Sequence, residues 1–220
     1  MKKGIGYLIF NAIFIIPSII MVGINGVTAL PIILMVFSLS ITGGLLLTDK
    51  IKVEQENLYS GFENAISKID NFKADKTHRA VDSVIALDEK NEKIAVSEKS
   101  GTYVYNFRDI VESEIIQDEV SISKVSRAGQ LGGALVGGAL AGGVGAVIGG
   151  LSSAKTNETQ VKNISLKLVV DSLQGPYQTV RFLNSQVPLK PNNPEYTKAF
   201  DAATHWQSVL NVILKRNSKE

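Results

Sequence analysis

The chain has 220 residues, a formal net charge of +2 and no cysteine. The lack of cysteine excludes disulfides, thiol nucleophiles and zinc sites built from cysteine. The 23 basic and 21 acidic residues balance once Lys2 and Lys3 are set aside, and these two are the only charged side chains before Asp49. A chain that is neutral beyond residue 3 lacks the basic footprint of a nucleic-acid-binding protein, so we expect no nucleic-acid partner.

The N-terminal region is apolar, because residues 4–48 carry no charged side chain. Asn25 and Gly26 interrupt this run near its middle. Each half then has about the 20 residues that a bilayer-spanning helix needs. The sequence therefore predicts a two-helix transmembrane hairpin over residues 1–48. Lysines lie outside both spans and none lies between them, so the positive-inside rule predicts a multi-pass protein of the cell membrane with its main domain in the cytoplasm. A cleavable signal peptide, with a small-residue site at residues 27–29, is the alternative.

Residues 50–79 are predicted to form an amphipathic linker helix. Leu58, Phe62, Ile66 and Ile69 recur three or four positions apart, while charged and amide side chains fill the other face. This stripe packs on its own domain in one interpretation and forms a short coiled coil between protomers in the other. Its length of about two heptads favours packing on the domain.

Short runs with strand periodicity follow, at residues 83–88, 93–97, 102–107, 108–117, 120–125, 160–170 and 177–183. Pro194 then begins an amphipathic helix that carries Trp206, the only tryptophan of the chain. This order of antiparallel strands followed by one capping helix resembles the pleckstrin-homology-like (PH-like) fold. The predicted fold class is a membrane-anchored α+β protein, with a PH-like antiparallel β domain at residues 80–216 that ends in a C-terminal capping helix.

An uncharged, glycine-rich insertion interrupts this domain at residues 128–154. Small residues recur every four positions in two adjacent rows, so on a helix they form a flat face that another backbone can approach, as in helices packed in lipid. The strands on both sides belong to one domain, so a single membrane crossing is excluded and a helical hairpin is predicted; a flexible linker is the alternative. The residues predicted to pack helices or to enter the membrane are Gly129, Gly133, Gly137, Gly138, Gly142, Gly145, Gly149 and Gly150.

Three stretches carry a resemblance to a known group of proteins: VIALDEKNEKIAV, YVYNFRDIVESEI and, after the glycine block, NISLKLVVDS. With the insertion between them, they resemble bacterial PH-like-domain membrane proteins with a glycine-zipper-like insertion, often of Gram-positive or prophage origin. The resemblance covers roughly residues 80–185. Its motifs are structural, so it implies no catalytic residue.

The sequence offers no pattern typical of catalysis, of metal binding or of cofactor binding. His78 and His205 lie far apart in sequence and outside any zinc motif, and Asp201 is expected to form a local pair with His205 one turn later on the last helix. The glycines lack both the G-K-[ST] and the G-x-G-x-x-G pattern of phosphate-binding loops. The carboxylates of residues 109–119 are interpreted as a solvated strand face. We therefore predict no enzyme, no cofactor and no metal.

These features predict a non-catalytic, membrane-anchored binding or sensing module. The resemblance implies a link to a phage or other mobile element, with phage exclusion or a host-envelope interaction as the expected role. The expected partners are the lipid bilayer and either a second copy of the chain or another membrane protein. The alternative is a membrane-active oligomer whose glycine-zipper segment forms or gates a pore.

Overall fold

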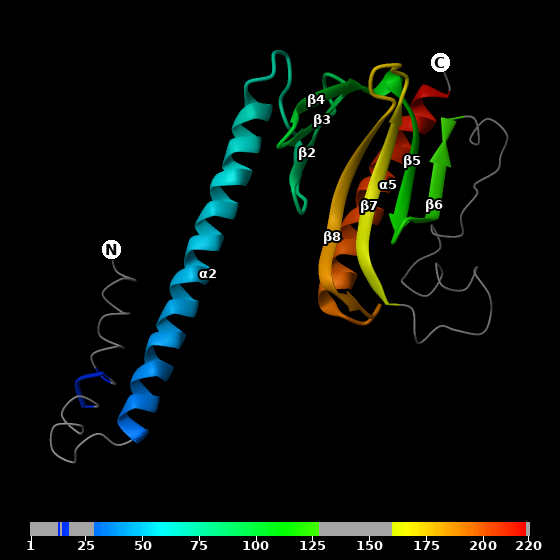
Figure 1. Cartoon of the computed structure of the whole chain (residues 1–220). Helices are drawn as coiled ribbons and strands as arrows, with labels where there is room; N and C mark the ends of the chain where they lie inside the picture. The colour runs from blue at the N-terminus through cyan, green and yellow to red at the C-terminus, as the bar shows by residue number, and fades with distance from the viewer. Residues whose placement is uncertain (1–12, 14, 18–28, 128–159, 219–220) are drawn as a thin grey trace, which may run out of the picture. The chain divides into compact units, whose positions relative to one another are not determined.

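The computed structural model of the chain describes residues 13, 15–17, 29–127 and 160–218. Two units are distinguished by their internal contacts, Met1–Leu58 and Tyr59–Glu220. The long helix α2 (Ala29–Ser67) begins in the first unit and ends in the second (Figure 1). All strands and the last helix, α5 (Pro194–Asn217), belong to the second unit.

Helix α2 corrects the predicted boundary between a membrane hairpin and a linker helix. The charged residues Asp49, Lys50 and Lys52 were expected to separate two helices, but α2 continues through them without a break. The physical reason is that charge alone does not end a helix, since lysine is a good helix former and no proline follows Pro31 within α2.

The predicted transmembrane hairpin is wrong. Within the part of the chain that the structure describes, no helix is long and apolar enough to cross a membrane. Only residues 13 and 15–17 of the first predicted span are described. The second predicted span is the first half of α2, whose second half is rich in charged residues.

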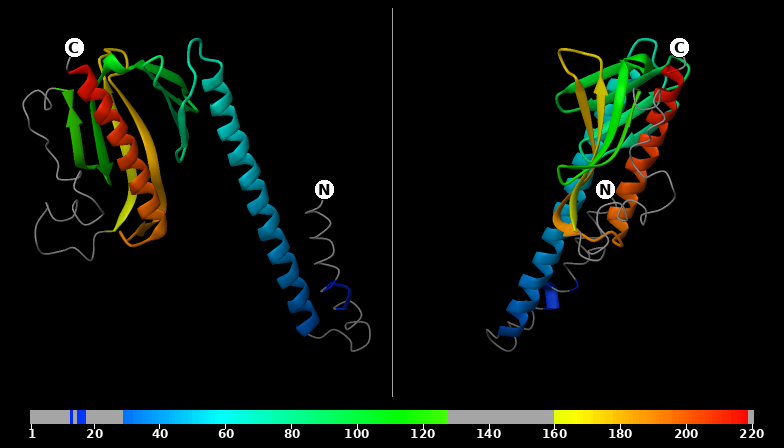
Figure 2. Two further views of the ribbon diagram at one scale, coloured as in Figure 1. Left: turned by 180° about the vertical axis from the view of Figure 1, so that it is seen from behind. Right: turned by 90° about the vertical axis from the view of Figure 1, so that its right-hand side faces the viewer.

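The second unit contains two antiparallel sheets of four strands each (Figure 2). The first sheet has the order β1-β2-β3-β4, and its strands are β1 (Lys76–Arg79), β2 (Ser83–Asp88), β3 (Lys93–Glu98) and β4 (Gly101–Asn106). A short 3-10 helix, η1 (Phe107–Asp109), leads into the second sheet. That sheet has the order β6-β5-β7-β8, and its strands are β5 (Ile110–Gln117), β6 (Val120–Ser126), β7 (Val161–Val170) and β8 (Tyr177–Leu189).

The main core lies between α5 and the facing sides of both sheets. Asn193 caps the start of α5, because its side chain accepts a hydrogen bond from the backbone of Glu195. The apolar stripe of α5 then packs over β5, β7 and β8 (Figures 1 and 2). The largest buried side chains of this core are Ile85, Ile94, Ile110, Ile115, Ile164, Leu166, Leu168, Trp206, Leu210 and Leu214.

The end of α2 packs on its own domain. Of the two interpretations of the linker helix, this agrees with packing on the domain and not with a coiled coil between protomers. Phe62 and Ile66 are buried, and the hydroxyl of Tyr59 donates a 2.6 Å hydrogen bond to the carbonyl oxygen of Ala80. The β2 and β3 side chains that alternate with the main core are also buried although they are small, for example Ala86 and Ala95. Small side chains let a helix approach a sheet closely.

The predicted α+β class and PH-like order of strands and helix are confirmed by these elements. The four residues of β1 lie in the segment that the sequence assigned to the linker helix, so this strand was missed. Its sequence, KTHR, is short, polar and mostly exposed. Such an edge strand has no alternation of apolar residues, and only pairing with β2 identifies it.

Candidate functional site

The eight glycines predicted to pack helices or to enter the membrane lie outside the described residues, which end at Arg127 and resume at Gln160. The structure does describe the strands on either side of the insertion and the residues that bind them. Strands β6 and β7 carry the two ends of the insertion, and the residues around them form the candidate site.

The order of the second sheet places the two ends far apart. Both β6 and β7 pair with β5 in antiparallel fashion, so they run parallel to each other. Ser126, at the end of β6, lies opposite Glu112, whereas Ile164, near the start of β7, lies opposite Gln117. Five residues of strand separate these positions, or about 17 Å at roughly 3.4 Å per residue. The chain therefore leaves the sheet at one end of β5 and returns at the other.

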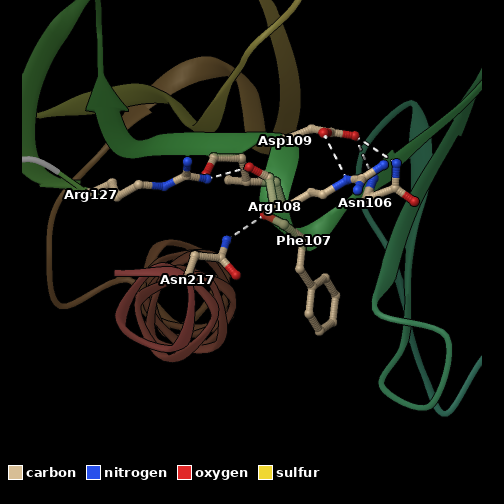
Figure 3. Close-up of polar contacts among 7 residues, drawn as sticks. Asn106, Phe107, Arg108, Asp109, Arg127 and Asn217 are labelled. Carbon is tan, nitrogen blue, oxygen red and sulfur yellow. Dashed lines mark hydrogen bonds and ion pairs between the residues drawn. The ribbon is translucent and has the colours of Figure 1, made fainter. Parts of the chain in front are cut away.

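Arg127 fixes the point where the chain leaves. Its guanidinium donates to the carbonyl oxygens of Arg108 and Ile110, the second at 2.7 Å (Figure 3). The β5–β6 ladder begins only at Glu112, so these carbonyls have no strand partner on that side. The arginine side chain continues the hydrogen bonding of β6 beyond its last residue, with charge-assisted bonds that are stronger than neutral ones.

The turn that receives Arg127 is itself held on both sides. The side-chain amide of Asn106 donates a 2.7 Å hydrogen bond to the Asp109 carboxylate, which closes η1 (Figure 3). The side chain of Asn217, at the end of α5, donates a 2.6 Å bond to the carbonyl oxygen of Phe107. The Phe107 ring is buried in the core. Helix α5, η1 and the end of β6 are thus one hydrogen-bonded unit.

Asp118 fixes the point where the chain returns. Its carboxylate accepts hydrogen bonds from the backbone N–H groups of Lys162 and Asn163, the shorter at 2.9 Å. Asp118 and Glu119 form the two-residue turn between β5 and β6, and both have positive φ, 43° and 72°. Such turns favour Asn and Gly. Asp118 thus combines a strained backbone conformation with hydrogen bonds to β7 that neither Gly nor a neutral Asn could make in the same way.

Glu119→Gly should raise the free energy of unfolding by roughly 0.5–1 kcal/mol, because glycine adopts the left-handed backbone without a Cβ clash. Urea denaturation followed by far-UV circular dichroism measures this change. Glu114→Gly, in the middle of β5, is the matched control and should destabilise the domain. A loss of stability in Glu119→Gly would show that the turn is not strained.

The remaining candidate residues are placed differently from what the sequence suggested. His205 does not pair with Asp201, since its Nε2 atom lies 3.3 Å from Lys76 Nζ. Burial, followed by the charges of Lys198 and His205, lowers the pKa of His78 below its ordinary value. Among the residues that the structure describes, no group of three His, Cys, Asp or Glu side chains is arranged to hold a metal ion.

Neither Arg127 nor Asp118 was predicted from the sequence as an anchor of the strands beside the insertion. A signal for each was present, because Arg127 is the last charged residue before the glycine block and Asp118-Glu119 separates two strand runs. Both signals are weak, since a charged residue at the end of a strand or in a turn is ordinary. Their roles depend on carbonyl and N–H groups that only the paired sheet supplies.

A family model described as "Glycine zipper containing PH domain" matches residues 71–184. This range includes both sheets up to β8, the two anchoring residues and the whole glycine block. The chain belongs to this family. The matched residues nearly coincide with residues 80–185, over which the sequence resembles PH-like proteins.

Two relatives of this glycine-zipper PH protein come from the same phage. One, from Bacillus phage SPbeta, is named "Immunity protein"; it is 33% identical over 180 residues, which cover 78% of this chain and 86% of the relative. The other is the "SPbeta prophage-derived uncharacterized membrane protein YomJ" of Bacillus subtilis strain 168, 30% identical over 180 residues, or 78% of this chain and 76% of the relative. No solved structure matches the chain.

Proposed function

We propose that this protein is a non-catalytic, phage-linked immunity module that acts at the membrane and excludes a related phage. The observation that carries the proposal is the pair of contacts that Arg127 and Asp118 make at opposite ends of β5, where the strands before and after the glycine block pair with it. We infer that a PH-like domain built in this way presents the insertion to a partner. The relatives support the biological context, since one is named an immunity protein and the other a membrane protein.

The first half of α2 supports contact with lipid or with another apolar partner. Its large apolar side chains are exposed, among them Ile33 at 61%, Phe37 at 63% and Leu47 at 63%. Exposed apolar surface of this extent is typical of interaction sites. We propose the lipid bilayer as one partner, and a second copy of the chain or another membrane protein as the other.

Phage exclusion is tested by plaque formation. A Bacillus strain that lacks SPbeta should become resistant to SPbeta when it expresses the wild-type chain. Replacing residues 129–154 with a Ser-Gly linker of equal length should abolish this resistance while the PH-like domain stays folded. Equal length keeps the number of residues between β6 and β7 unchanged. Resistance that survives the replacement would contradict the proposal.

Arg127→Gln should also abolish resistance, and it should lower the free energy of unfolding by about 1–3 kcal/mol, because two carbonyl groups lose a charge-assisted partner. Arg108→Gln is the matched control, since this side chain is 83% exposed and reaches only Asp109, at 3.7 Å, while the Arg108 carbonyl that accepts from Arg127 is unchanged. Plaque counts and urea denaturation measure the two effects. Full resistance in Arg127→Gln would show that phage exclusion does not need the Arg127 contacts.

A pore is the competing activity, and it rests on residues 128–159, which lie outside the described part of the chain. Dye release from vesicles separates the two hypotheses. Dye release by the wild-type chain that Gly137→Leu with Gly145→Leu abolishes would favour a pore. Exclusion without permeabilisation favours the binding module.

A further inference from the structure

The turn between β5 and β6 is a strained connection. Asp118 and Glu119 form it, and both adopt left-handed backbone, with φ of 43° and 72°. In this conformation a Cβ lies too close to the following carbonyl oxygen, which is why two-residue hairpin turns favour Asn and Gly. If the turn opened so that β5 continued straight into β6, both residues could adopt extended backbone and the strain would disappear.

Strand β6 is an edge strand that few apolar side chains hold in place. It pairs with β5 on one side only, and of its seven residues only Ser123 and Val125 are buried. Ser113, opposite Val125 on β5, is buried too, and its hydroxyl has no hydrogen-bond partner among the residues that the structure describes. An interface that buries hydroxyl groups stabilises a strand less than an apolar one does, so β6 can detach more readily than the central strands.

Specific polar contacts recognise β6. The buried side chain of Gln207 on α5 accepts from the Ser123 hydroxyl at 2.9 Å and donates to the Ser123 carbonyl oxygen at 3.1 Å. Outside the core, Lys124 pairs with Glu112 of β5 at 2.8 Å. These contacts select the sequence of β6, whichever chain it belongs to. Because every copy of the chain carries both β6 and the groups that bind it, β6 of a second copy fits β5 and α5 equally well.

We propose that two copies of the chain exchange β6 and form a domain-swapped dimer. In this dimer the turn is open, β5 and β6 of each chain form one continuous strand, and each β6 pairs with β5 of the other copy. All contacts of β6 are made again between the copies, and only the strained turn is lost. Short connections under strain favour such an exchange. Because the exchange is reciprocal, the dimer closes on itself with twofold symmetry.

The exchange also moves the start of the glycine-rich insertion to the second copy. Arg127 follows β6 directly, so its guanidinium meets the same carbonyl oxygens, at η1 and β5, of the partner subunit. Residues 128–159 then join β6 in one body to β7 in the other; an extended chain of that length reaches about 100 Å, several times the diameter of a small domain. The proposal names the partner within the proposed immunity function, and it rests on that function for the role of the dimer in exclusion.

Two neighbouring turn residues should affect the dimer in opposite directions. The Asp118 carboxylate holds the turn closed, because it accepts from the backbone N–H groups of Lys162 and Asn163. Asp118→Ala removes these bonds and keeps a Cβ in the turn, so it should raise the share of swapped dimer by about fivefold. Glu119→Gly removes a Cβ clash from the closed turn, so it should lower that share by about fivefold.

Cysteine cross-linking measures the exchange, because the chain has no cysteine of its own. Glu114 of β5 and Lys124 of β6 lie directly opposite each other, as a disulfide requires. The full chain with Glu114→Cys is co-expressed with a differently tagged full chain that carries Lys124→Cys, purified in detergent and oxidised. A mixed, disulfide-linked dimer is expected on a non-reducing gel. Ser121→Cys, exposed on β6 but opposite Ile116, is the matched control and should not cross-link to Glu114→Cys.

The chain that carries both Glu114→Cys and Lys124→Cys shows whether the pair can be linked at all. A disulfide that forms only within one chain, with no mixed dimer, would overturn the proposal, and so would the absence of any disulfide, which would contradict the pairing of β5 with β6. A mixed dimer whose share does not fall in Glu119→Gly would show that the copies meet without opening the turn, and would overturn it too. Plaque counts are measured in the same strains. Full resistance without exchange leaves the immunity function standing, and exchange without resistance leaves the dimer standing.

Discussion

Trp206→Ala should lower the free energy of unfolding by about 3–5 kcal/mol, the range found when a large aromatic side chain is removed from a core. The Trp206 side chain is only 2% exposed, and it belongs to the same core cluster as Leu166, Leu168 and Val180. The facing strands cannot collapse into the cavity, because each is hydrogen-bonded to its neighbours. Urea denaturation followed by far-UV circular dichroism measures the change.

Val212→Ala is the matched control on the same helix, because Val212 is 52% exposed. It should change the stability by less than about 0.5 kcal/mol. A loss below about 1 kcal/mol in Trp206→Ala would place α5 outside the core and contradict the PH-like arrangement.

Asp88→Ala should lower the free energy of unfolding by about 2–4 kcal/mol, because it removes a buried carboxylate that accepts several hydrogen bonds. The Asp88 side chain is fully buried, and its carboxylate accepts from the backbone N–H of Lys73 at 2.6 Å and from that of Asn91 at 2.9 Å. It also accepts from the Asn91 side chain at 2.7 Å. One carboxylate therefore holds the chain before β1 to the turn between β2 and β3.

The same carboxylate makes the stability depend on pH. Burial raises the pKa of Asp88, but hydrogen bonds from Asn91 and from backbone N–H groups outweigh burial and hold the pKa below its ordinary value of 3.8. A lowered pKa in the folded state stabilises the fold at neutral pH, and this contribution is lost as the pH falls below about 4. Asp88→Asn should therefore flatten the acid side of the stability profile.

Asp82→Ala is the control for both measurements. Its carboxylate pairs with Arg181 at 2.7 Å, but both side chains are about 40% exposed, at 42% and 41%. An exposed ion pair contributes only about 0–1 kcal/mol. If Asp82→Ala and Asp88→Ala cost the same, the buried hydrogen bonds of Asp88 would not have the importance assigned to them here.

The strands and the last helix were predictable because their signals are local. The alternation in SVIALD and KIAVS and the apolar stripe that contains Trp206 can each be recognised from neighbouring residues, and the structure places them at nearly the predicted bounds. The same local rules failed at the start of the chain. Hydropathy and charge predicted a helix end near residue 48, whereas α2 continues to Ser67 because no proline or capping residue stops it.

The candidate site was predictable only in part. The glycine rows are visible in the sequence because a four-residue period needs no partner to be recognised. Arg127 and Asp118 were not visible as anchors, because their hydrogen-bond partners are backbone groups of η1, β5 and β7, up to 45 residues away in sequence. Nothing in the sequence marks which carbonyl at the start of a strand will lack a neighbour.

The sequence by itself determined the α+β composition of this protein, its glycine-rich insertion, the capping helix and the balance of charge beyond residue 3. Periodicity and composition are properties of neighbouring residues, so they can be recognised without a structure. The tertiary structure alone decided that β6 and β7 flank β5, that the strands before and after the insertion meet opposite ends of β5, and that His205 of α5 lies beside Lys76 of β1. These are long-range pairings, and which of them form depends on how the sheets and α5 bury their apolar faces together.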